Sequence, residues 1–261
     1  MVDTWKLNGG RFERAQVTIA PGLVKIFDEI LVNAIDQHTL HPKKVTRIDV
    51  SWKGDYITVR NNGDGIPIKK HEKEQVWLPE LIFGHLLTSS NYDDSKERTT
   101  GGRNGYGAKL TNVFSKDFTV KVVSSGQVYT QRWTDNMSKM VDPLIEDRKT
   151  GGGVEVSFMP DWTKFGGKHI EALYAIITRR TWDAAMCCPK AHVYLNGTRI
   201  DVASLEAYAK MHEELSLGRQ AYVICPRIDE PDPQKAFALQ AKSSADFFWN
   251  RSKNGDSENK G

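Results

Sequence analysis

The sequence predicts an α+β fold, a two-layer α/β sandwich in which helices pack on a mixed, mostly antiparallel β-sheet. Three observations predict it. The strand-like segments come in hairpins, the helix-like segments lie between hairpins rather than after every strand, and the longest helix is apolar on one face only. A parallel, doubly wound sheet would instead alternate strand and helix along the chain.

The first helix and the first hairpin have clear local signals. Pro21 opens a helix over residues 21–38, because apolar side chains recur there at the spacing of one buried face. Residues 45–52 and 56–60 alternate apolar and polar side chains on either side of Lys53-Gly54-Asp55, which predicts a β-hairpin.

Three more strand regions are expected further along the chain. Residues 118–123 and 128–133 predict a second hairpin across Ser124-Ser125-Gly126, and residues 154–158 predict a further strand. The strongest local hairpin signal is Asn196-Gly197, which directly follows the apolar residues 193–195. These segments extend the sheet mainly by antiparallel pairing.

Four other helices complete the predicted pattern, and one loop separates two of them. The predicted helices are residues 79–87, 110–114, 170–186 and 205–215. The polar stretch that ends at Thr100 is expected to be a mobile loop.

The elements suggest one main domain. We expect it over residues 1–217, followed by a divergent, unassigned segment over residues 218–249. Residues 250–261 contain no hydrophobic residue, so a disordered tail is expected there.

Composition narrows the class of protein. The 261 residues are 39% hydrophobic and 26% charged, which is enough for a real core. No run approaches the eighteen apolar residues of a membrane span, and the N-terminus lacks the apolar core of a secretory signal. Cys187, Cys188 and Cys225 fit neither a disulfide framework nor a zinc site, so a reducing compartment is expected. A net charge of +3 does not by itself predict nucleic-acid binding.

A glycine-rich segment, Gly-Gly-Arg-Asn-Gly-Tyr-Gly-Ala-Lys at residues 101–109, predicts a polyphosphate site. Glycines let the backbone approach a phosphate closely and direct N–H groups at it, while Arg103 and Lys109 add positive charge. The helix expected directly after it would favour anions at its N-terminus. The segment matches neither the Walker A pattern nor the G-x-G-x-x-G dinucleotide fingerprint.

Three polar side chains of the first helix are predicted to face one cleft. At about 100° per residue, Glu29, Asn33 and Asp36 fall within an arc of about 60°, whereas Asp28 points about 100° aside and is the weaker candidate. The Asn33 amide oxygen suits Mg²⁺, and Glu29 is placed to orient or deprotonate an attacking water. The alternative is that they are ordinary polar residues at the edge of an amphipathic helix.

Two further segments offer polar contacts to a nucleotide. The turn Asn61-Asn62-Gly63-Asp64-Gly65 would set an amide or a backbone group against an adenine edge, and its glycines would allow close packing. The hydroxyl and amide groups of residues 89–91 would contact ribose or phosphate. The alternatives are an ordinary turn and an ordinary helix end.

The motifs together resemble a known family. Residues 25–34 (Lys-Ile-Phe-Asp-Glu-Ile-Leu-Val-Asn-Ala), 86–94 (Leu-Leu-Thr-Ser-Ser-Asn-Tyr-Asp-Asp) and 100–109 are similar to the ATPase domain of eukaryotic-type DNA topoisomerase II. The wider family is the GHKL ATPases, which share the Bergerat fold, a two-layer sandwich. The resemblance is dense over residues 21–118 and is not found after about residue 217.

The resemblance implies roles for individual residues. Glu29 would be the general base, Asn33 the Mg²⁺ ligand and Asp36 a helper in the same motif. The remaining ATP-binding residues would lie in the turn, in the loop and in the segment that wraps the triphosphate as the ATP lid. They are Asn61, Asn62, Gly65, Ile66, Ser89, Ser90, Asn91, Gly101, Gly102, Arg103, Asn104, Gly105, Tyr106, Gly107, Ala108 and Lys109.

The resemblance also implies a function and partners. The expected cofactors are ATP and Mg²⁺. ATP binding would join two such domains as a homodimer that acts as a gate for DNA strand passage, and hydrolysis would reset the gate. If the protein comes from a eukaryotic cell, the resemblance implies that it lies in the nucleus. Otherwise it implies an intracellular location, either the cytoplasm or a viral factory. No membrane partner is expected.

Several departures from the family pattern shape these expectations. The N-terminal Arg-Pro-x-x-Tyr-Ile-Gly segment, the Gln-Thr-Lys loop of the transducer domain and the cleavage tyrosine are not found in the sequence. DNA contacts are therefore expected through regions absent from this chain, and the isolated chain is expected to hydrolyse ATP slowly or not at all. Val154 replaces a threonine of the family, and its side chain cannot form a hydrogen bond toward the base.

Two other functions are compatible with the motifs. One is a nucleotide-binding module without turnover, either regulatory or degenerate, because a triphosphate site without the transducer lysine loses charge stabilisation in the transition state. The other is a MutL-like enzyme, which the Ser-Ser-Asn-Tyr-Asp-Asp run disfavours.

Overall fold

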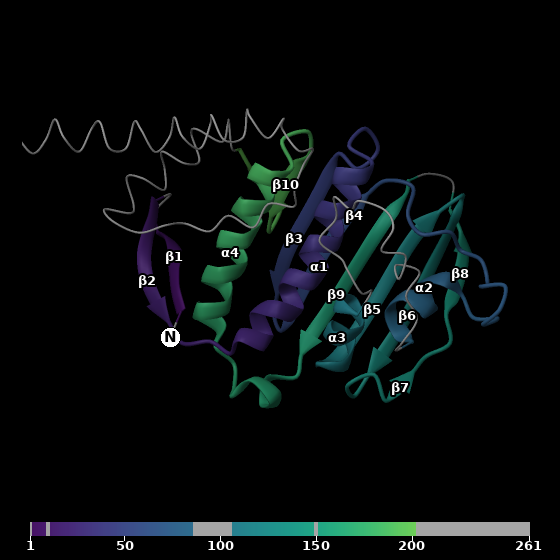
Figure 1. Cartoon of the computed structure of the whole chain (residues 1–261), viewed down its shortest axis with the longest axis horizontal. Helices are drawn as coiled ribbons and strands as arrows, with labels where there is room; N and C mark the ends of the chain where they lie inside the picture. The colour runs from purple at the N-terminus through teal and green to yellow at the C-terminus, as the bar shows by residue number, and fades with distance from the viewer. Residues whose placement is uncertain (1, 9–10, 86–105, 149–150, 202–261) are drawn as a thin grey trace, which may run out of the picture. The chain divides into compact units, whose positions relative to one another are not determined.

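The computed structural model describes residues 2–8, 11–85, 106–148 and 151–201, and these residues form two sheets and a layer of helices (Figure 1). The larger sheet has the strand order β11-β10-β3-β4-β9-β5-β6-β7, and β8 also pairs with β6. Its strands are β3 (Arg47–Lys53), β4 (Tyr56–Asn62), β5 (Ser115–Ser124), β6 (Gln127–Thr134), β7 (Lys139–Met140), β8 (Leu144–Asp147), β9 (Gly153–Pro160), β10 (His192–Leu195) and β11 (Thr198–Ile200). The smaller sheet is the hairpin of β1 (Val2–Asn8) and β2 (Arg11–Val17).

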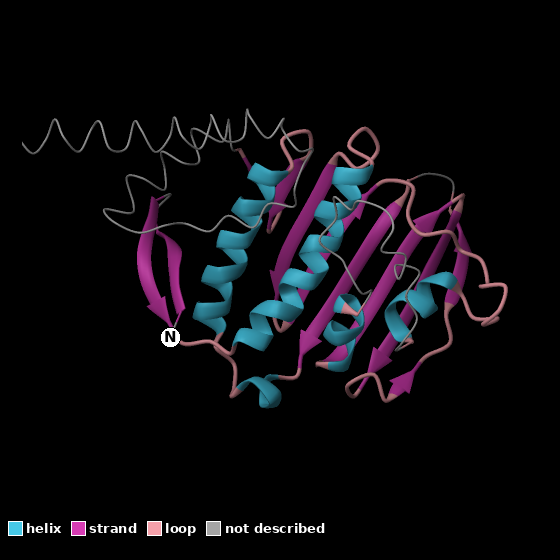
Figure 2. Cartoon of the chain, viewed as in Figure 1, coloured by secondary structure: helices cyan, strands magenta, loops and turns pink. Residues whose placement is uncertain are grey.

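The helices lie on one face of the larger sheet, as Figure 2 shows. They are α1 (Pro21–Leu40), α2 (Leu78–Gly84), α3 (Gly107–Val113) and α4 (Ile170–Cys187), with a short 3-10 turn η1 (Trp162–Phe165) before α4. Every strand pair of the larger sheet is antiparallel except β10 with β3. The predicted α+β sandwich with a mixed, mostly antiparallel sheet is confirmed.

The helix α1 forms where the sequence predicts it. Pro21 occupies its first turn, where a missing N–H breaks no helical hydrogen bond. Its apolar residues then recur every three or four positions and are buried, as Leu23, Phe27 and Ile30 illustrate. Since α1 contacts β4 as well as α3 and α4, its polar edge is held at a fixed place above the sheet.

Alternation along the strands separates the two faces of the sheet. In β4, Ile57, Val59 and Asn61 are buried under the helices, whereas the residues between them are more exposed. In β5, Phe118 and Val120 are fully buried on the same side. Burying each such side chain contributes roughly 1.5–3 kcal/mol, so this face forms the core.

Some elements differ from the prediction. The strands β1, β2, β7 and β8 were not predicted. The segments of β7 and β8 are only two and four residues long, and those of β1 and β2 do not alternate apolar and polar residues strictly. The first helix ends at Leu40 rather than at residue 38, and α2 covers residues 78–84. The loop that ends at Thr100, the helix at 205–215, the segment 218–249 and the tail 250–261 lie outside the described residues. None of the described helices is long and apolar enough to cross a membrane.

Candidate functional site

The predicted polar edge lies in the middle of α1. Glu29, Asn33 and Asp36 are separated by four and three residues, so they follow one side of α1. Asn33 is exposed, the Glu29 side chain is 21% exposed, and Asp36 is only 6% exposed. Of the three side chains on this edge, Asn33 is therefore the most accessible to a ligand and Asp36 the least.

The start of α3 lies directly against Glu29. A Cβ atom built on Gly107 would stand 1.8 Å from Glu29 Oε2 and 2.6 Å from its Cδ. Only a residue without a side chain leaves room for the carboxylate in this position. The segment that predicts a polyphosphate site and the helix that carries the predicted base therefore meet at one point.

The other Glu29 oxygen has a charged partner on the same helix. Lys25 Nζ forms an ion pair with Glu29 Oε1 across one turn of α1. Lys25 is largely exposed, so the pair adds little stability but biases the direction of the carboxylate. Lys25 was not among the predicted site residues, although the spacing of four residues between the two charges is a recognisable signal.

Two hydrogen bonds fix the position of α3. Thr111 Oγ1 donates to the backbone oxygen of Ile26 on α1 at 2.8 Å. Asn112 Nδ2 donates to the backbone oxygen of Phe83 on α2 at 3.0 Å. Both side chains are fully buried, so α3 is anchored to both neighbouring helices and keeps Gly107 in place.

Lys109 is buried in the first turn of α3, two residues after Gly107. Its side chain is 1% exposed, and burial lowers its pKa because an ammonium group loses hydration there. A buried lysine two residues from Gly107, which lies against Glu29, suits a role beside phosphate oxygens. Tyr106 is half-buried and Ala108 is buried next to it.

The glycine turn after β4 packs tightly against the sheet. Gly65 has a φ of +72°, and a Cβ atom there would stand 2.2 Å from the backbone oxygen of Val123. Both facts require glycine at this position. Ile66 follows with a half-buried side chain that packs on the main core.

Asn61 and Asn62 lie on opposite sides of the sheet. The Asn61 side chain is buried on the helix-covered side, and its Nδ2 donates to the backbone oxygen of Asn62 at 2.9 Å. The Asn62 Oδ1 accepts from the backbone N–H groups of Thr46 and Arg47 at 2.8 and 2.9 Å, and its Nδ2 donates to Thr46 Oγ1. The Asn62 amide therefore fixes the start of β3, and the nucleotide contact predicted for Asn62 would have to use its backbone.

Val154 lies beside Asn61 on the helix-covered side. The two residues are paired in register between β4 and β9, and Val154 packs on the core. Because directly paired side chains point to the same face, a residue at 154 would share any ligand that Asn61 contacts.

The site offers a suitable amide for a magnesium ion. Asn33 is exposed one turn from Glu29, and no hydrogen bond of its amide is formed within the described ranges. The described residues contain no group of three or more His, Cys, Asp or Glu side chains that could hold a metal ion by themselves. Asn33 thus fits a Mg²⁺ ion whose other ligands are water and phosphate oxygens.

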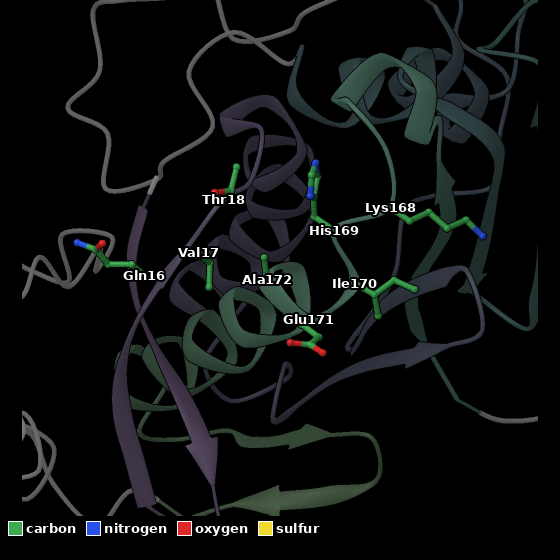
Figure 3. A pocket seen from close by; sticks show the side chains of 8 residues that line it. All are labelled: Gln16, Val17, Thr18, Lys168, His169, Ile170, Glu171 and Ala172. Atoms are coloured by element: carbon green, nitrogen blue, oxygen red, sulfur yellow. The ribbon is translucent and has the colours of Figure 1, made fainter.

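Two surface hollows lie away from Glu29. One, of about 420 Å³, lies where the end of β2 meets the start of α4, and Figure 3 shows Thr18, Lys168 and His169 around it. The other, of about 430 Å³, lies beside the glycine turn and is lined by Arg60, Asn62 and Arg148 among others. Neither hollow is lined by Glu29, Asn33 or Asp36.

The remaining predicted contacts belong to two segments, residues 89–91 and the start of the glycine-rich segment. Ser89, Ser90 and Asn91, as well as the lid residues 101–105, lie outside the described residues. Thr111 is a residue of this site that the prediction missed. Its position four residues after a glycine and inside a short helix gave no signal, because only the packing of α3 on α1 brings its hydroxyl to Ile26.

Several known proteins have sequences similar to this chain. A family profile described as histidine kinase-, DNA gyrase B- and HSP90-like ATPase matches residues 18–164. DNA topoisomerase 2 of Saccharomyces cerevisiae is 46% identical over 202 residues, which are 75% of this chain and 14% of that protein. DNA topoisomerase 2 of Candida albicans is 42% identical over 224 residues, 84% of this chain and 15% of that protein. The chain therefore spans about one seventh of the length of these relatives.

Solved structures agree with the sequence matches. The crystal structure of the ATPase region of Saccharomyces cerevisiae topoisomerase II has a TM-score of 0.78 at 42% identity, over 82% of this chain and 58% of that chain. The crystal structure of the ATPase and transducer domains of Balamuthia mandrillaris topoisomerase II has a TM-score of 0.74 at 39% identity, over 81% of this chain and 56% of that chain. The resemblance inferred from the sequence is confirmed: the chain belongs to the family of histidine kinase-, DNA gyrase B- and HSP90-like ATPases and is similar to the ATPase region of eukaryotic DNA topoisomerase 2.

Proposed function

We propose that this chain is the Mg²⁺-dependent ATP-binding and ATP-hydrolysing domain of a type II DNA topoisomerase. The observation that carries the proposal is the contact between the Glu29 carboxylate and Gly107, which joins the helix of the predicted base to the glycine-rich segment. The family match over residues 18–164 supports the same assignment.

Glu29 acts as the general base in the proposed reaction. Its carboxylate orients the attacking water at the γ-phosphate and accepts a proton from it as the P–O bond to the β-phosphate breaks. Lys25 and Gly107 restrict the directions that this carboxylate can take. A base held in one orientation needs little rearrangement when the nucleotide arrives.

Asn33, Asp36 and Lys109 bind the nucleotide in this proposal. Asn33 supplies an amide oxygen to Mg²⁺, and the ion, when bound, neutralises developing charge on the phosphate oxygens. Lys109 adds positive charge at the phosphates, and Asp36 supports the edge of α1 from its buried position. Asn61 lies at the adenine end, with Val154 as its neighbour.

The similarity to these relatives supports a proposed role in a whole enzyme. ATP binding joins two copies of the domain, and this closure drives passage of one DNA duplex through another. DNA contacts belong to parts of the enzyme beyond the segment that this chain shares with its relatives. Nuclear localisation follows for a eukaryotic cellular enzyme.

Calorimetry with a non-hydrolysable ATP analogue tests the binding step. We expect binding in the presence of Mg²⁺ and much weaker binding with EDTA, because Asn33 is proposed to act through the ion. If circular dichroism shows that the protein is folded and no heat of binding is measured, the proposed function is disproved.

A matched pair of variants tests the chemical step. Glu29→Gln keeps the shape of the side chain, so it should abolish phosphate release and leave analogue binding within about threefold, a difference of less than 1 kcal/mol. Glu72→Gln makes the same change at an exposed site away from α1 and should behave like the natural chain. Equal phosphate release from Glu29→Gln and from the natural chain would exclude Glu29 as the base.

A further inference from the structure

Four charged side chains form a network between α1 and α4 that the proposed reaction does not use. Arg180 Nε lies 3.2 Å from Asp28 Oδ1 and Arg180 Nη1 lies 3.8 Å from Asp183 Oδ2, while Arg179 Nε lies 3.0 Å from Asp183 Oδ1. The side chains of Asp28, Arg180 and Asp183 are 18%, 25% and 5% exposed. The network is therefore largely shielded from water.

This network is a poor source of stability. Burial raises the pKa of Asp28 to about 6, although Arg180 and Lys25 act in the opposite direction, and burial also raises the pKa of Asp183. A buried ion pair often stabilises a fold less than apolar side chains of the same size would. Replacing both Asp28 and Arg180 by apolar side chains would therefore cost the contact between α1 and α4 little stability.

The position of Asp28 suggests what the network does instead. Asp28 and Glu29 are consecutive residues of α1, so their side chains point about 100° apart. Asp28 points to Arg180 on α4, and Glu29 points to Gly107 on α3. The two contacts hold α1 from two sides at the same helical level.

A small rotation of α1 would be enough to disturb Glu29. The carboxylate lies about 5–6 Å from the helix axis, so a rotation of roughly 10° moves it by about 1 Å. A displacement of that size in a reacting group can lower a rate by about a hundredfold. The Asp28–Arg180 pair resists this rotation because its partner belongs to another helix.

We propose, on the basis of the proposed ATPase function, that Asp28 is a positioning residue for Glu29: its pairing with Arg180 fixes the rotation of α1 so that the base faces the start of α3. The carboxylate of Asp28 itself touches neither nucleotide nor water in the reaction. In this role the ion pair serves the orientation of Glu29 rather than the stability of the fold.

Several charged groups around Asp28 act on the pKa of its carboxyl. Lys25 and Glu29 face it from α1, and Arg180 and Asp183 face it from α4. The elements that contact α1 carry four further charged groups. Two belong to α4: Arg179, which pairs with Asp183, and Glu171 in the first turn of that helix. The other two lie on α3 and β4. They are Lys109 of α3, which is buried, and Arg60 of β4, which lies on the face of the sheet away from α1.

The first test is a kinetic comparison in the full chain. Asp28→Asn should lower kcat for phosphate release at least tenfold and leave the KM for ATP within about twofold. The isosteric control Asp55→Asn removes a carboxylate from the exposed pair with Lys168 and should change neither. Proportional loss of kcat and binding, or no loss at all, would overturn the positioning role.

A nuclear magnetic resonance titration gives a second readout that needs no turnover. The amide signal of Gly107, which lies against Glu29, should show a titration step with the same midpoint as the carboxyl carbon signal of Asp28. Asp28→Asn should lose that step. If the Gly107 signal titrates identically in both proteins, Asp28 is not coupled to Glu29 and the proposal fails.

The two tests separate the inference from the function on which it rests. A natural chain that binds no ATP analogue disproves the proposed function, whereas the titration still decides whether Asp28 and Glu29 are coupled. Arg180→Gln should reproduce the loss of the Gly107 step, and the double variant should be no worse than either single one, since both remove the same contact. Additive effects on kcat would count against a shared contact.

Discussion

Replacing Gly107 by alanine is the most direct perturbation of the contact that defines the site. The new Cβ atom would stand 1.8 Å from Glu29 Oε2, whereas ordinary contacts between such atoms are about 3.5 Å. The hydrogen bonds of Thr111 and Asn112 hold α3, so the carboxylate must move instead. A shift of more than about 1 Å predicts a loss of roughly a hundredfold in phosphate release.

The same variant should remain folded. Alanine favours a helix over glycine by about 1 kcal/mol, and moving the Glu29 side chain off its preferred rotamer costs about 0.5–1.5 kcal/mol. The two effects nearly cancel, so the free energy of unfolding in urea should change by less than about 1 kcal/mol. Binding of a non-hydrolysable ATP analogue should change much less than turnover.

Gly22→Ala is the matched control for this variant. It introduces a methyl group into α1, where the nearest side-chain atom, Phe165 Cε1, is 3.3 Å from the new Cβ and can adjust. Phosphate release should therefore stay at its natural rate in that protein. Natural turnover in Gly107→Ala as well would refute the reasoning, because it would mean that Glu29 need not occupy the space beside residue 107.

Three other predictions concern stability and affinity. Folding raises the pKa of the Asp28 carboxyl from 3.8 to about 6, so the folded chain binds the carboxyl proton more tightly than the unfolded chain does. Protonation of Asp28 therefore stabilises the fold. This stabilisation is fully present below pH 3.8 and is lost as the pH rises through about 6. Asp28→Asn should remove this dependence, at most roughly 3 kcal/mol, from urea unfolding curves measured across that range, and unchanged curves would contradict the assigned burial. Val154→Thr should place a hydroxyl beside Asn61 and strengthen adenine nucleotide binding by about 1 kcal/mol, roughly fivefold in calorimetric Kd, with no gain for a pyrimidine nucleotide. Asn62→Ala should leave the N–H groups at the start of β3 unpaired and lower the unfolding free energy by about 1–3 kcal/mol, and an effect on nucleotide affinity alone would show that its amide serves the ligand instead.

Local patterns in the sequence were sufficient for most elements of the fold. The apolar stripe of α1 and the turns at Gly54, Ser125-Gly126 and Asn196-Gly197 depend only on neighbouring residues, so helices and hairpins could be predicted without tertiary information. The order of strands was not predictable in this way. The parallel pairing of β10 with β3 joins residues far apart in the chain, and the weakly patterned strands β7 and β8 form only because β6 offers them an edge.

In the candidate site, too, some features were predictable from the sequence and others depend on tertiary packing. By themselves, the spacing of Glu29, Asn33 and Asp36 and the glycine-rich segment predicted a nucleotide site, because helical periodicity and backbone freedom are properties of the local sequence. Tertiary packing alone decided that Gly107 lies against Glu29, that the Asn62 amide serves β3, and that Asp28 faces Arg180 on α4. Each of these contacts joins separate elements, and their distances depend on how the helices pack on each other and on the sheet.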